Sequence, residues 1–478
     1  MAIVLRLLLL CGVVLCGTLG TRAEKPNVIV IFTDDQGYGD LGVYGAEGFS
    51  TPEIDRMASE GIRFTNFHVV FPSCTMSRMG LLTGRYPYRW GKMGGVYFPW
   101  SRDGLPQSEV TIAEILKEQG YATSIVGKWH LGHLPEFLPT EQGFDSYFGI
   151  PYSNDMAHDG GMPLAPNAKL LGGMTLEDYH AYLPQEVGKD EGRELYRKYK
   201  DKVPLMENTE VIEWPVDQTQ ITRRFTERAI DFIDENADRP FFLYLAHSMP
   251  HVPLFVSDTF EERTERGLYG DVIEEIDWSV GQVLEALRER GLDQNTLVVF
   301  TSDNGPWLAQ GDTGGSAGSL RDGKGTTYEG GQRVPSIFWW PGRIPAGVVS
   351  DFDGSTLDIL PTVAALAGAE LPTDRVIDGL DIRPVLLGNE SEAPSREFFI
   401  YGGGQGISKD GWKYRKGRLH GTWIRKQKGA ENPQVEQLFN LEEDLGEQTN
   451  VIEQYPEKAK TLKQLLQREM AAMNPNSN

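Results

Sequence analysis

The chain alternates short apolar runs with amphipathic helical patterns, and this alternation restricts the folds open to it. Residues 27–33, NVIVIFT, form a β-branched run of the kind that is buried on both faces of a sheet. Strands separated by helices predict an α/β fold with a large mixed, mainly parallel sheet covered on both faces. We expect further strands at residues 121–126, 241–246, 296–301 and 336–340, and helices at residues 52–61, 108–119 (with Ser108 as N-cap), 219–236, 272–290 and 355–366.

Two segments depart from this alternation. Residues 153–215 are rich in Gly, Pro and charge and lack clean periodicity, which predicts a surface insertion in a main domain of residues 24–371. Residues 372–478 predict a smaller C-terminal α+β subdomain. Its expected elements are antiparallel strands at 412–415 and 437–441 and a closing helix at 456–470.

The first 23 residues are typical of a secretory signal peptide. Arg6 supplies a positive start, residues 7–15 form an apolar run, and Thr21 and Ala23 fit the small residues of a cleavage site. The run is too short for a comfortable membrane span, although an anchor is the alternative. We therefore expect an exported protein, periplasmic, secreted or lysosomal, with no stable membrane span. Its cleavage leaves Cys74 as the sole cysteine, so no internal disulfide forms.

The overall charge excludes one class of partner. The 478 residues include 46 Lys and Arg against 68 Asp and Glu, a formal net charge of -22. Binding to nucleic acid depends on basic surface that neutralises phosphates. The sequence therefore indicates no nucleic-acid partner.

Acidic side chains follow two of the expected strands at the point where each ends. Asp34 and Asp35 follow the first strand, and Asp303 and Asn304 follow the strand at 296–301. Ligands of open α/β sheets bind beyond the carboxyl ends of the strands. Carboxylate and amide oxygens are hard ligands that suit Ca²⁺ or Mg²⁺. Each motif alone also fits an ordinary turn, and their pairing favours a cation site.

Cys74 stands where a helix is expected to begin. The exposed backbone N–H groups of a first helical turn attract anions. Arg78 lies four residues on and hence on the same helix face. Together they predict an anion pocket with a reactive group, although a lone cysteine is more often an inert buried side chain.

These residues resemble the sulfatase family of the alkaline phosphatase superfamily. The family signature, C-x-P-S-R followed by a Leu-rich turn and T-G-R, compares with CTMSR at 74–78 and LLTGR at 81–85. Six further segments occur in family order: DDQG at 34–37, GKWHLG at 127–132, GIPYS at 149–153, PHVP at 250–253, SDNG at 302–305 and GKGTTYEGG at 323–331. With the tail LFNLEED at 438–444, they look most like the arylsulfatase A and N-acetylgalactosamine-6-sulfatase branch. The resemblance implies an alkaline-phosphatase-like α/β/α sandwich.

The resemblance also implies a cofactor and a metal. In sulfatases the signature cysteine is oxidised by a separate formylglycine-generating enzyme to 3-oxoalanine (formylglycine), whose hydrated aldehyde is the nucleophile. That residue corresponds to Cys74. Met76 stands where the signature usually has Pro, and this departure bears on how efficiently Cys74 is oxidised. The residues that match the metal site, usually for Ca²⁺, are Asp34, Asp35, Cys74, Asp303 and Asn304.

Five more residues match catalytic or substrate-binding positions of the family. His130 corresponds to a proton acceptor, and His251 to the group that contacts the sulfate and protonates the leaving oxygen. We prefer His251 to its neighbour His247 because His251 lies in the PHVP segment at 250–253, which resembles the family. Lys128, Lys324 and Ser153 correspond to further groups around the sulfate. Basic and aromatic residues at 409–428 are a candidate surface for an anionic sugar, with a solvated face as the alternative.

The sequence thus predicts a sulfuric ester hydrolase, an arylsulfatase-type enzyme acting on an aryl sulfate or sulfated carbohydrate. Two alternatives stay open. One is a phosphatase or phosphodiesterase of the same superfamily. The other is a non-catalytic sulfoglycan-binding protein with unmodified Cys74. The sugar, the sulfate position and the oligomeric state are not determined at this level.

Overall fold

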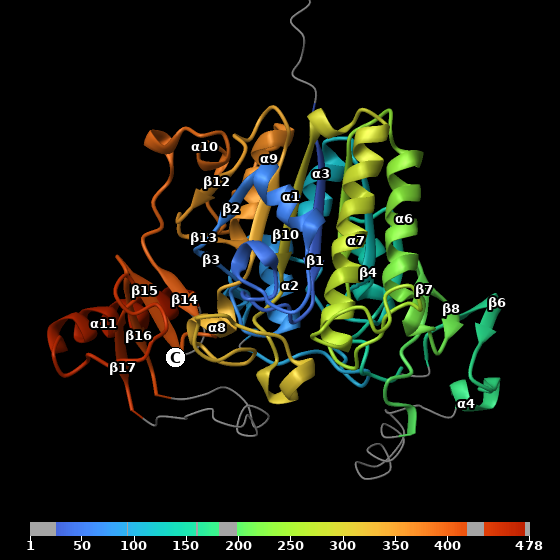
Figure 1. Cartoon of the computed structure of the whole chain (residues 1–478), viewed down its shortest axis with the longest axis horizontal. Coiled ribbons are helices and arrows are strands. Elements are labelled where there is room, and N and C mark those ends of the chain that lie inside the picture. The colour runs from blue at the N-terminus through green and yellow to red at the C-terminus, as the bar shows by residue number, and fades with distance from the viewer. Residues whose placement is uncertain (1–24, 93, 159–160, 181–197, 418–434, 474–478) are drawn as a thin grey trace, which may run out of the picture.

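An eleven-stranded mixed sheet forms the centre of the molecule (Figure 1). The computed structural model describes residues 25–92, 94–158, 161–180, 198–417 and 435–473. The predicted signal peptide at 1–23 lies outside the described residues, as does most of the basic segment at 409–428. Within the described ranges, none of the helices is both long and apolar enough to cross a bilayer.

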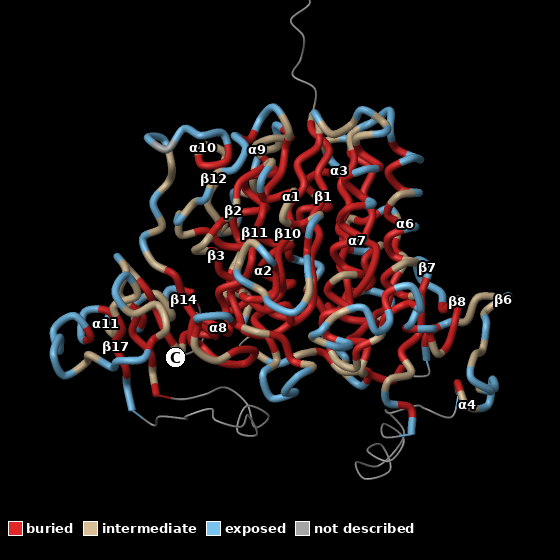
Figure 2. The backbone as a smooth tube through the Cα atoms, viewed as in Figure 1, coloured by how far each residue is buried: buried red, intermediate tan, exposed pale blue. Residues whose placement is uncertain are grey.

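The middle of the sheet is parallel, as its buried β-branched strands predict. Strand β1 (Asn27–Thr33) pairs in parallel with β10 (Thr296–Ser302) on one side and β9 (Phe241–Ala246) on the other, and β4 (Ala122–Lys128) and β5 (Ser146–Ile150) continue beyond β9. Every residue of β1, β4, β9 and β10 is buried, and Figure 2 shows this inner region in red. The five carboxyl ends therefore lie along one edge.

The outer strands complete the mixed sheet. On the β10 side lie the antiparallel strand β11 (Ser336–Trp339), then β2 (Ile62–Phe64) and β12 (Val348–Ser350). On the β5 side, the segment predicted as an insertion adds β7 (Leu205–Glu207), β8 (Glu210–Trp214) and β6 (Leu164–Leu170). These three strands have mixed polarity, so their sequences did not predict them.

Helices cover the sheet in two layers. Helices α1 (Pro52–Glu60), α6 (Ile221–Glu235) and α7 (Leu268–Glu289) pack together, and Figure 1 shows α6 and α7 crossing in front of the strands. Helices α2 (Cys74–Thr83), α3 (Ile112–Glu118) and α9 (Ile359–Ala367) form the other group. The predicted α/β/α sandwich is thus confirmed.

Two predicted helix starts are wrong. Helix α3 is capped by Thr111 and not by Ser108, because Thr111 forms a capping box in which its hydroxyl accepts from the Glu114 N–H at 3.1 Å and its own N–H donates to the Glu114 carboxylate at 2.7 Å. Helix α7 begins four residues earlier than predicted, after Gly267.

The C-terminal part forms a separate four-stranded antiparallel sheet, as predicted. Its strands are β14 (Phe399–Tyr401), β15 (Gly406–Lys409), β16 (Trp412–Arg415) and β17 (Gln437–Asn440), in that order. Helix α11 (Pro456–Met473) packs against β15 and β16. The short strands β14 and β15 were not predicted.

One close backbone approach positions the functional edge. Gly127 has a φ of 120° and lies so near β9 that a Cβ there would be 1.9 Å from the Ala246 carbonyl oxygen. Only glycine fits this position. It therefore holds Lys128, the last residue of β4, close to the end of β9.

Candidate active site at the carboxyl ends of the central strands

Each of the five central parallel strands leads into residues of one site. The sequence-predicted residues that follow these strands are Asp34 and Asp35 after β1, Asp303 and Asn304 after β10, His130 just beyond the final Lys128 of β4, Ser153 after β5 and His251 after β9. Cys74 and Arg78 come from α2, and Lys324 from a loop. The topology therefore brings together residues nearly 300 positions apart.

The acidic residues form a buried, hydrogen-bonded group. The Asp35 N–H donates to Asp303 Oδ1 at 3.1 Å, and Asn304 Nδ2 donates to Asp35 Oδ1 at 2.8 Å. Asp35 also has a φ of 61°, a left-handed conformation that non-glycine residues seldom adopt. Such strain persists only where the surroundings hold it, and it is common at functional sites.

Three buried cations face the three carboxylates. Lys128 contacts Asp34, Lys324 Nζ lies 2.6 Å from Asp35, and Arg78 Nη2 lies 2.9 Å from Asp303. Burial opposes ionisation of Asp34, but the combined charges of Lys128 and the other positive neighbours outweigh it and hold the pKa of Asp34 well below its usual range. Burial and the neighbouring Asp34 charge raise the pKa of Asp303 to about 7.

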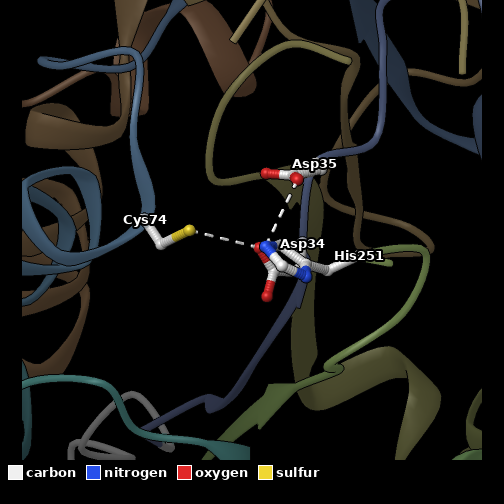
Figure 3. Close-up of side chains that lie close together, drawn as sticks. All are labelled: Asp34, Asp35, Cys74 and His251. Atoms are coloured by element: carbon white, nitrogen blue, oxygen red, sulfur yellow. Dashed lines mark hydrogen bonds and ion pairs between the residues drawn. The ribbon is translucent and has the colours of Figure 1, made fainter. Parts of the chain in front are cut away.

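Figure 3 shows the Cys74 side chain pointing toward Asp34, with Asp35 and His251 close by. Cys74 is the first residue of α2, and its Sγ donates to Asp34 Oδ1 at 3.4 Å. Lys324 Nζ approaches the same sulfur at 3.7 Å. Burial, reinforced by the Asp34 charge, raises the pKa of the Cys74 thiol well above its ordinary value.

The oxygen atoms around Cys74 fit a divalent cation. Ligand atoms of Asp34, Asp35, Cys74 and His251 lie within 4.8 Å of one another. Among the described residues, the buried Asn304 Oδ1 has no hydrogen-bond partner. A buried polar atom without a partner is costly, and a cation would satisfy it. Hard oxygen donors of this kind suit Ca²⁺ or Mg²⁺.

His251 and Ser153 lie beside the cation group. Ser153 Oγ is 3.1 Å from Lys128 Nζ and 3.4 Å from the His251 ring nitrogens. Asn154, which the sequence did not single out, fixes this histidine: Nδ2 donates to the His251 carbonyl at 3.2 Å and Oδ1 lies 3.1 Å from Nδ1. The alternative His247 instead bonds Ser279 Oγ at 3.1 Å in the core.

His130 reaches the site from another side. Its φ is 60°, and its Nε2 lies 2.9 Å from the Tyr97 carbonyl oxygen. The Thr75 hydroxyl, next to Cys74, donates to the His130 carbonyl at 3.1 Å. Burial and the Lys128 charge hold the pKa of His130 well below its usual range, so this imidazole is neutral and able to accept a proton.

The site opens into a cavity of about 880 Å³. Its lining includes four predicted residues: His130, Ser153, His251 and Lys324. It also includes Lys92, Asp103 and Trp307, none of which the sequence singled out individually as a site residue. Trp307 lies three residues after Asn304, and Lys324 Nζ makes a cation–π contact with its ring at 4.6 Å from the centroid. Position beyond a strand end was the one signal available for it.

Comparisons with known proteins agree with this geometry. A sequence model of the sulfatase family matches residues 26–369. The chain is 44% identical over 383 residues to human arylsulfatase A, covering 79% of this chain and 71% of that protein. It is 40% identical over 389 residues to human N-acetylgalactosamine-6-sulfatase, covering 80% and 69%.

Solved structures give the same result. The PsFucS1 sulfatase from Pseudoalteromonas sp. superimposes with a TM-score of 0.78 at 26% identity, covering 95% of this chain and 92% of that one. Ps i-CgsB in complex with k-i-k-neocarrahexaose superimposes with a TM-score of 0.73 at 30% identity, covering 94% and 93%. The alkaline-phosphatase-like fold is therefore shared with sulfatases of known structure. The chain belongs to the sulfatase family, whose enzymes hydrolyse sulfate esters.

Proposed function

We propose that the chain is an exported sulfatase that removes sulfate from a sulfated carbohydrate, using formylglycine at position 74 and one Ca²⁺ ion. The observation that carries this proposal is the meeting of Cys74 with three carboxylates and three cations at the carboxyl ends of the central strands. Phosphatases of this superfamily would normally use Ser or Thr as nucleophile, and the present site centres on cysteine.

Formylglycine, made from Cys74 by a formylglycine-generating enzyme, would supply a hydroxyl nucleophile after hydration. Asp34, Asp35, Asp303 and Asn304 would hold Ca²⁺, which polarises the sulfate and neutralises developing charge. Mg²⁺ is the second candidate because the donors are all oxygen. Arg78 orients Asp303 through two hydrogen bonds, at 3.1 and 2.9 Å.

The remaining cations bind the sulfate ester. Lys128 contacts Asp34 and Lys324 contacts Asp35, and Lys324 also lines the cavity. The Ser153 hydroxyl lies 3.1 Å from Lys128 Nζ and can donate or accept a hydrogen bond there. Together these side chains fix the sulfate against position 74, which lowers the entropy cost of the reaction.

Two histidines handle protons. His251 lies 3.6 Å from Asp35 and lines the cavity, a position from which it would protonate the leaving oxygen. His130 is neutral, and its backbone carbonyl accepts a hydrogen bond from Thr75 in the first turn of the Cys74 helix. From this position it would accept the proton of the free hydroxyl.

The substrate class follows from relatives and compartment. The similar human proteins are named for aryl sulfates and N-acetylgalactosamine 6-sulfate, and a similar solved structure holds a carrahexaose. We expect cleavage of the leader after Ala23 and export to the periplasm, the cell exterior or the lysosome. Small aryl sulfates would act as artificial substrates.

Mass spectrometry of residue 74 and turnover assays test the function. We expect peptides of the native protein to be about 18 Da lighter than the Cys form at position 74, because SH₂ is replaced by O. 4-Nitrophenyl sulfate should be hydrolysed at least ~100-fold faster than 4-nitrophenyl phosphate, and Cys74→Ala or removal of Ca²⁺ by a chelator should abolish the reaction.

Two results would contradict the proposal. An unmodified thiol in protein from its native source would favour a sulfoglycan-binding protein. Faster turnover of the phosphate would favour the phosphatase alternative. Melting curves of the Cys74→Ala variant serve as the control that lost activity is not lost folding.

A further inference from the structure

The wall of the cavity carries charged residues that the proposed reaction does not use. Lys92 and Asp103 both line the 880 Å³ cavity, together with Trp307. Lys92 and Asp103 belong to the segment that follows the short 3-10 helix Pro87–Trp90. Gly91, Gly94 and Gly95 of this segment also line the cavity. The glycines lie beside the larger lining residues Val96 and Phe98, and the cavity of about 880 Å³ has room for a ring beyond the sulfate.

Lys92 is held in place by an aromatic side chain. Its Nζ lies 4.1 Å from the centroid of the Tyr97 ring, a cation–π contact. The Tyr97 hydroxyl donates to the Gly104 carbonyl at 3.0 Å, and its N–H donates to Thr75 Oγ1 at 3.3 Å. Lys92 therefore rests on a platform that is bonded to the residue next to Cys74.

Lys92 and Asp103 line the same cavity without forming an ion pair with each other. No pair of 4.0 Å or less joins them in the part of the chain that the structure describes, yet the Asp103 charge partly offsets the effect of burial, which lowers the pKa of Lys92. A hydrogen-bond donor and an acceptor that are not paired with each other suit ligand groups that can both donate and accept hydrogen bonds. Sugar hydroxyls both donate and accept.

The charge on this wall does not favour a second anion. Lys92 is one positive charge against the two carboxylates Asp103 and Asp155, which also line the cavity. The surplus positive charge lies at the bottom of the cavity, where a divalent cation would join three lysine or arginine side chains that already balance three carboxylates. The bottom therefore takes one sulfate, and the wall favours an uncharged partner.

We propose that Lys92 and Asp103 bind hydroxyl groups of the sulfated sugar ring and select a ring with a single sulfate and no carboxylate or second sulfate. Lys92 donates to one hydroxyl and Asp103 accepts from another, while Trp307 offers an aromatic surface for the apolar face of the ring. This inference rests on the proposed function, and it names the substrate class of the same site.

Binding to the Cys74→Ala variant, which cannot turn over, tests the inference separately from activity. Calorimetry in the presence of Ca²⁺ would compare inorganic sulfate, three monosulfated sugars (N-acetylgalactosamine 6-sulfate, galactose 6-sulfate and galactose 3-sulfate) and N-acetylgalactosamine 4,6-disulfate. At least one monosulfated sugar should bind about tenfold more tightly than inorganic sulfate and than the disulfate, a difference of about 1.4 kcal/mol.

The substitutions Lys92→Met and Asp103→Asn should each remove most of that tenfold gain and leave the affinity for inorganic sulfate within about twofold. Lys169→Met, on the exposed side of β6, is the matched control and should change nothing. In the enzyme with formylglycine, Lys92→Met should raise KM for the sugar without changing turnover of 4-nitrophenyl sulfate, which lacks the hydroxyls.

Three outcomes would overturn the inference. Sugar sulfates that bind no more tightly than inorganic sulfate would show that the wall is idle. Tighter binding of the disulfate that is lost in Lys92→Met would make Lys92 a second-anion site. Equal losses for sulfate and sugars would give Lys92 a structural role. If the binding pattern holds but the native protein hydrolyses no sulfate ester, only the proposed function fails.

Discussion

Two buried charged clusters among the described residues differ in what surrounds them. The Asp34 cluster consists of Asp34, Asp35, Asp303, Arg78, Lys128 and Lys324. The Glu329 cluster consists of His68, Glu329, Arg333, Lys413 and Glu447, and it joins the main sheet domain to the C-terminal strand β16. Both clusters combine burial with opposite charges.

The Glu329 cluster pairs its charges internally. Lys413 Nζ lies 2.7 Å from Glu329 and 2.9 Å from Glu447, and all three side chains are fully buried. Arg333 and His68 contact the same Glu329 carboxylate at 2.6 and 3.0 Å, and both also line a separate cavity of about 510 Å³. The ion pairs of this cluster connect the C-terminal sheet to the larger part of the molecule.

The Asp34 cluster lies beside the cavity of about 880 Å³. Lys324 and His251 face the cavity, and Asn304 Oδ1 lacks a partner among the described residues. Strained backbone at Asp35 and His130 adds to the contrast. Unsatisfied atoms alone do not separate the clusters, since His68 Nδ1 and Glu447 Oε1 also lack a hydrogen bond among the described residues. The Asp34 cluster is distinguished by its strained backbone and by the cysteine among its carboxylates, features that are common at functional sites.

The largest expected effect separates the clusters by activity. Asp303→Asn should lower kcat/KM for 4-nitrophenyl sulfate by at least ~10³-fold, because it weakens cation binding worth several kcal/mol in the transition state. Stability should fall as well, because the variant leaves the buried Arg78 without its carboxylate partner and turns an amide N–H toward the Asp35 N–H. Steady-state kinetics and thermal melting check both parts. Activity within tenfold of the wild type would show that Asp303 holds no catalytic cation.

The second effect separates them by stability. Lys413→Met should destabilise the chain by about 3–5 kcal/mol, because it leaves Glu329 and Glu447 buried without their shared cation. Activity measured well below the melting temperature should stay within twofold. Chemical denaturation gives the free energy of unfolding, and the double variant Lys413→Met/Glu447→Gln should recover part of it. A loss under ~1 kcal/mol would remove the anchoring role.

The smallest effect concerns pH. Burial alone would raise the pKa of Glu329, but Lys413, Arg333 and His68 together outweigh burial and hold it well below its usual value. Its contribution to stability is therefore complete above the unfolded-state value near 4.5 and is lost as the pH falls below it. Melting temperatures between pH 6 and pH 3 should fall less steeply in Glu329→Gln than in the wild type. Equal slopes would mean that Glu329 does not couple folding to protons.

The sequence predicted the elements whose character is local. Strands β1, β9 and β16 have the predicted bounds, since apolar β-branched or alternating runs need no distant partner to be recognised. Strands β7 and β8 were missed because their mixed residues become strands only by pairing at the edge of the sheet. The start of α3 was misplaced because a nearby Ser competed with the true capping box at Thr111.

The sequence by itself determined the chemistry that this protein has available: one cysteine at a helix start, and acidic residues directly after two buried strands. Those features depend on residues near one another in the chain. The tertiary structure decided which buried charges gather around Cys74 and which connect two sheets. Lys413 and Lys128 are both fully buried lysines that contact carboxylates, and their different roles follow from what packs around each of them in three dimensions.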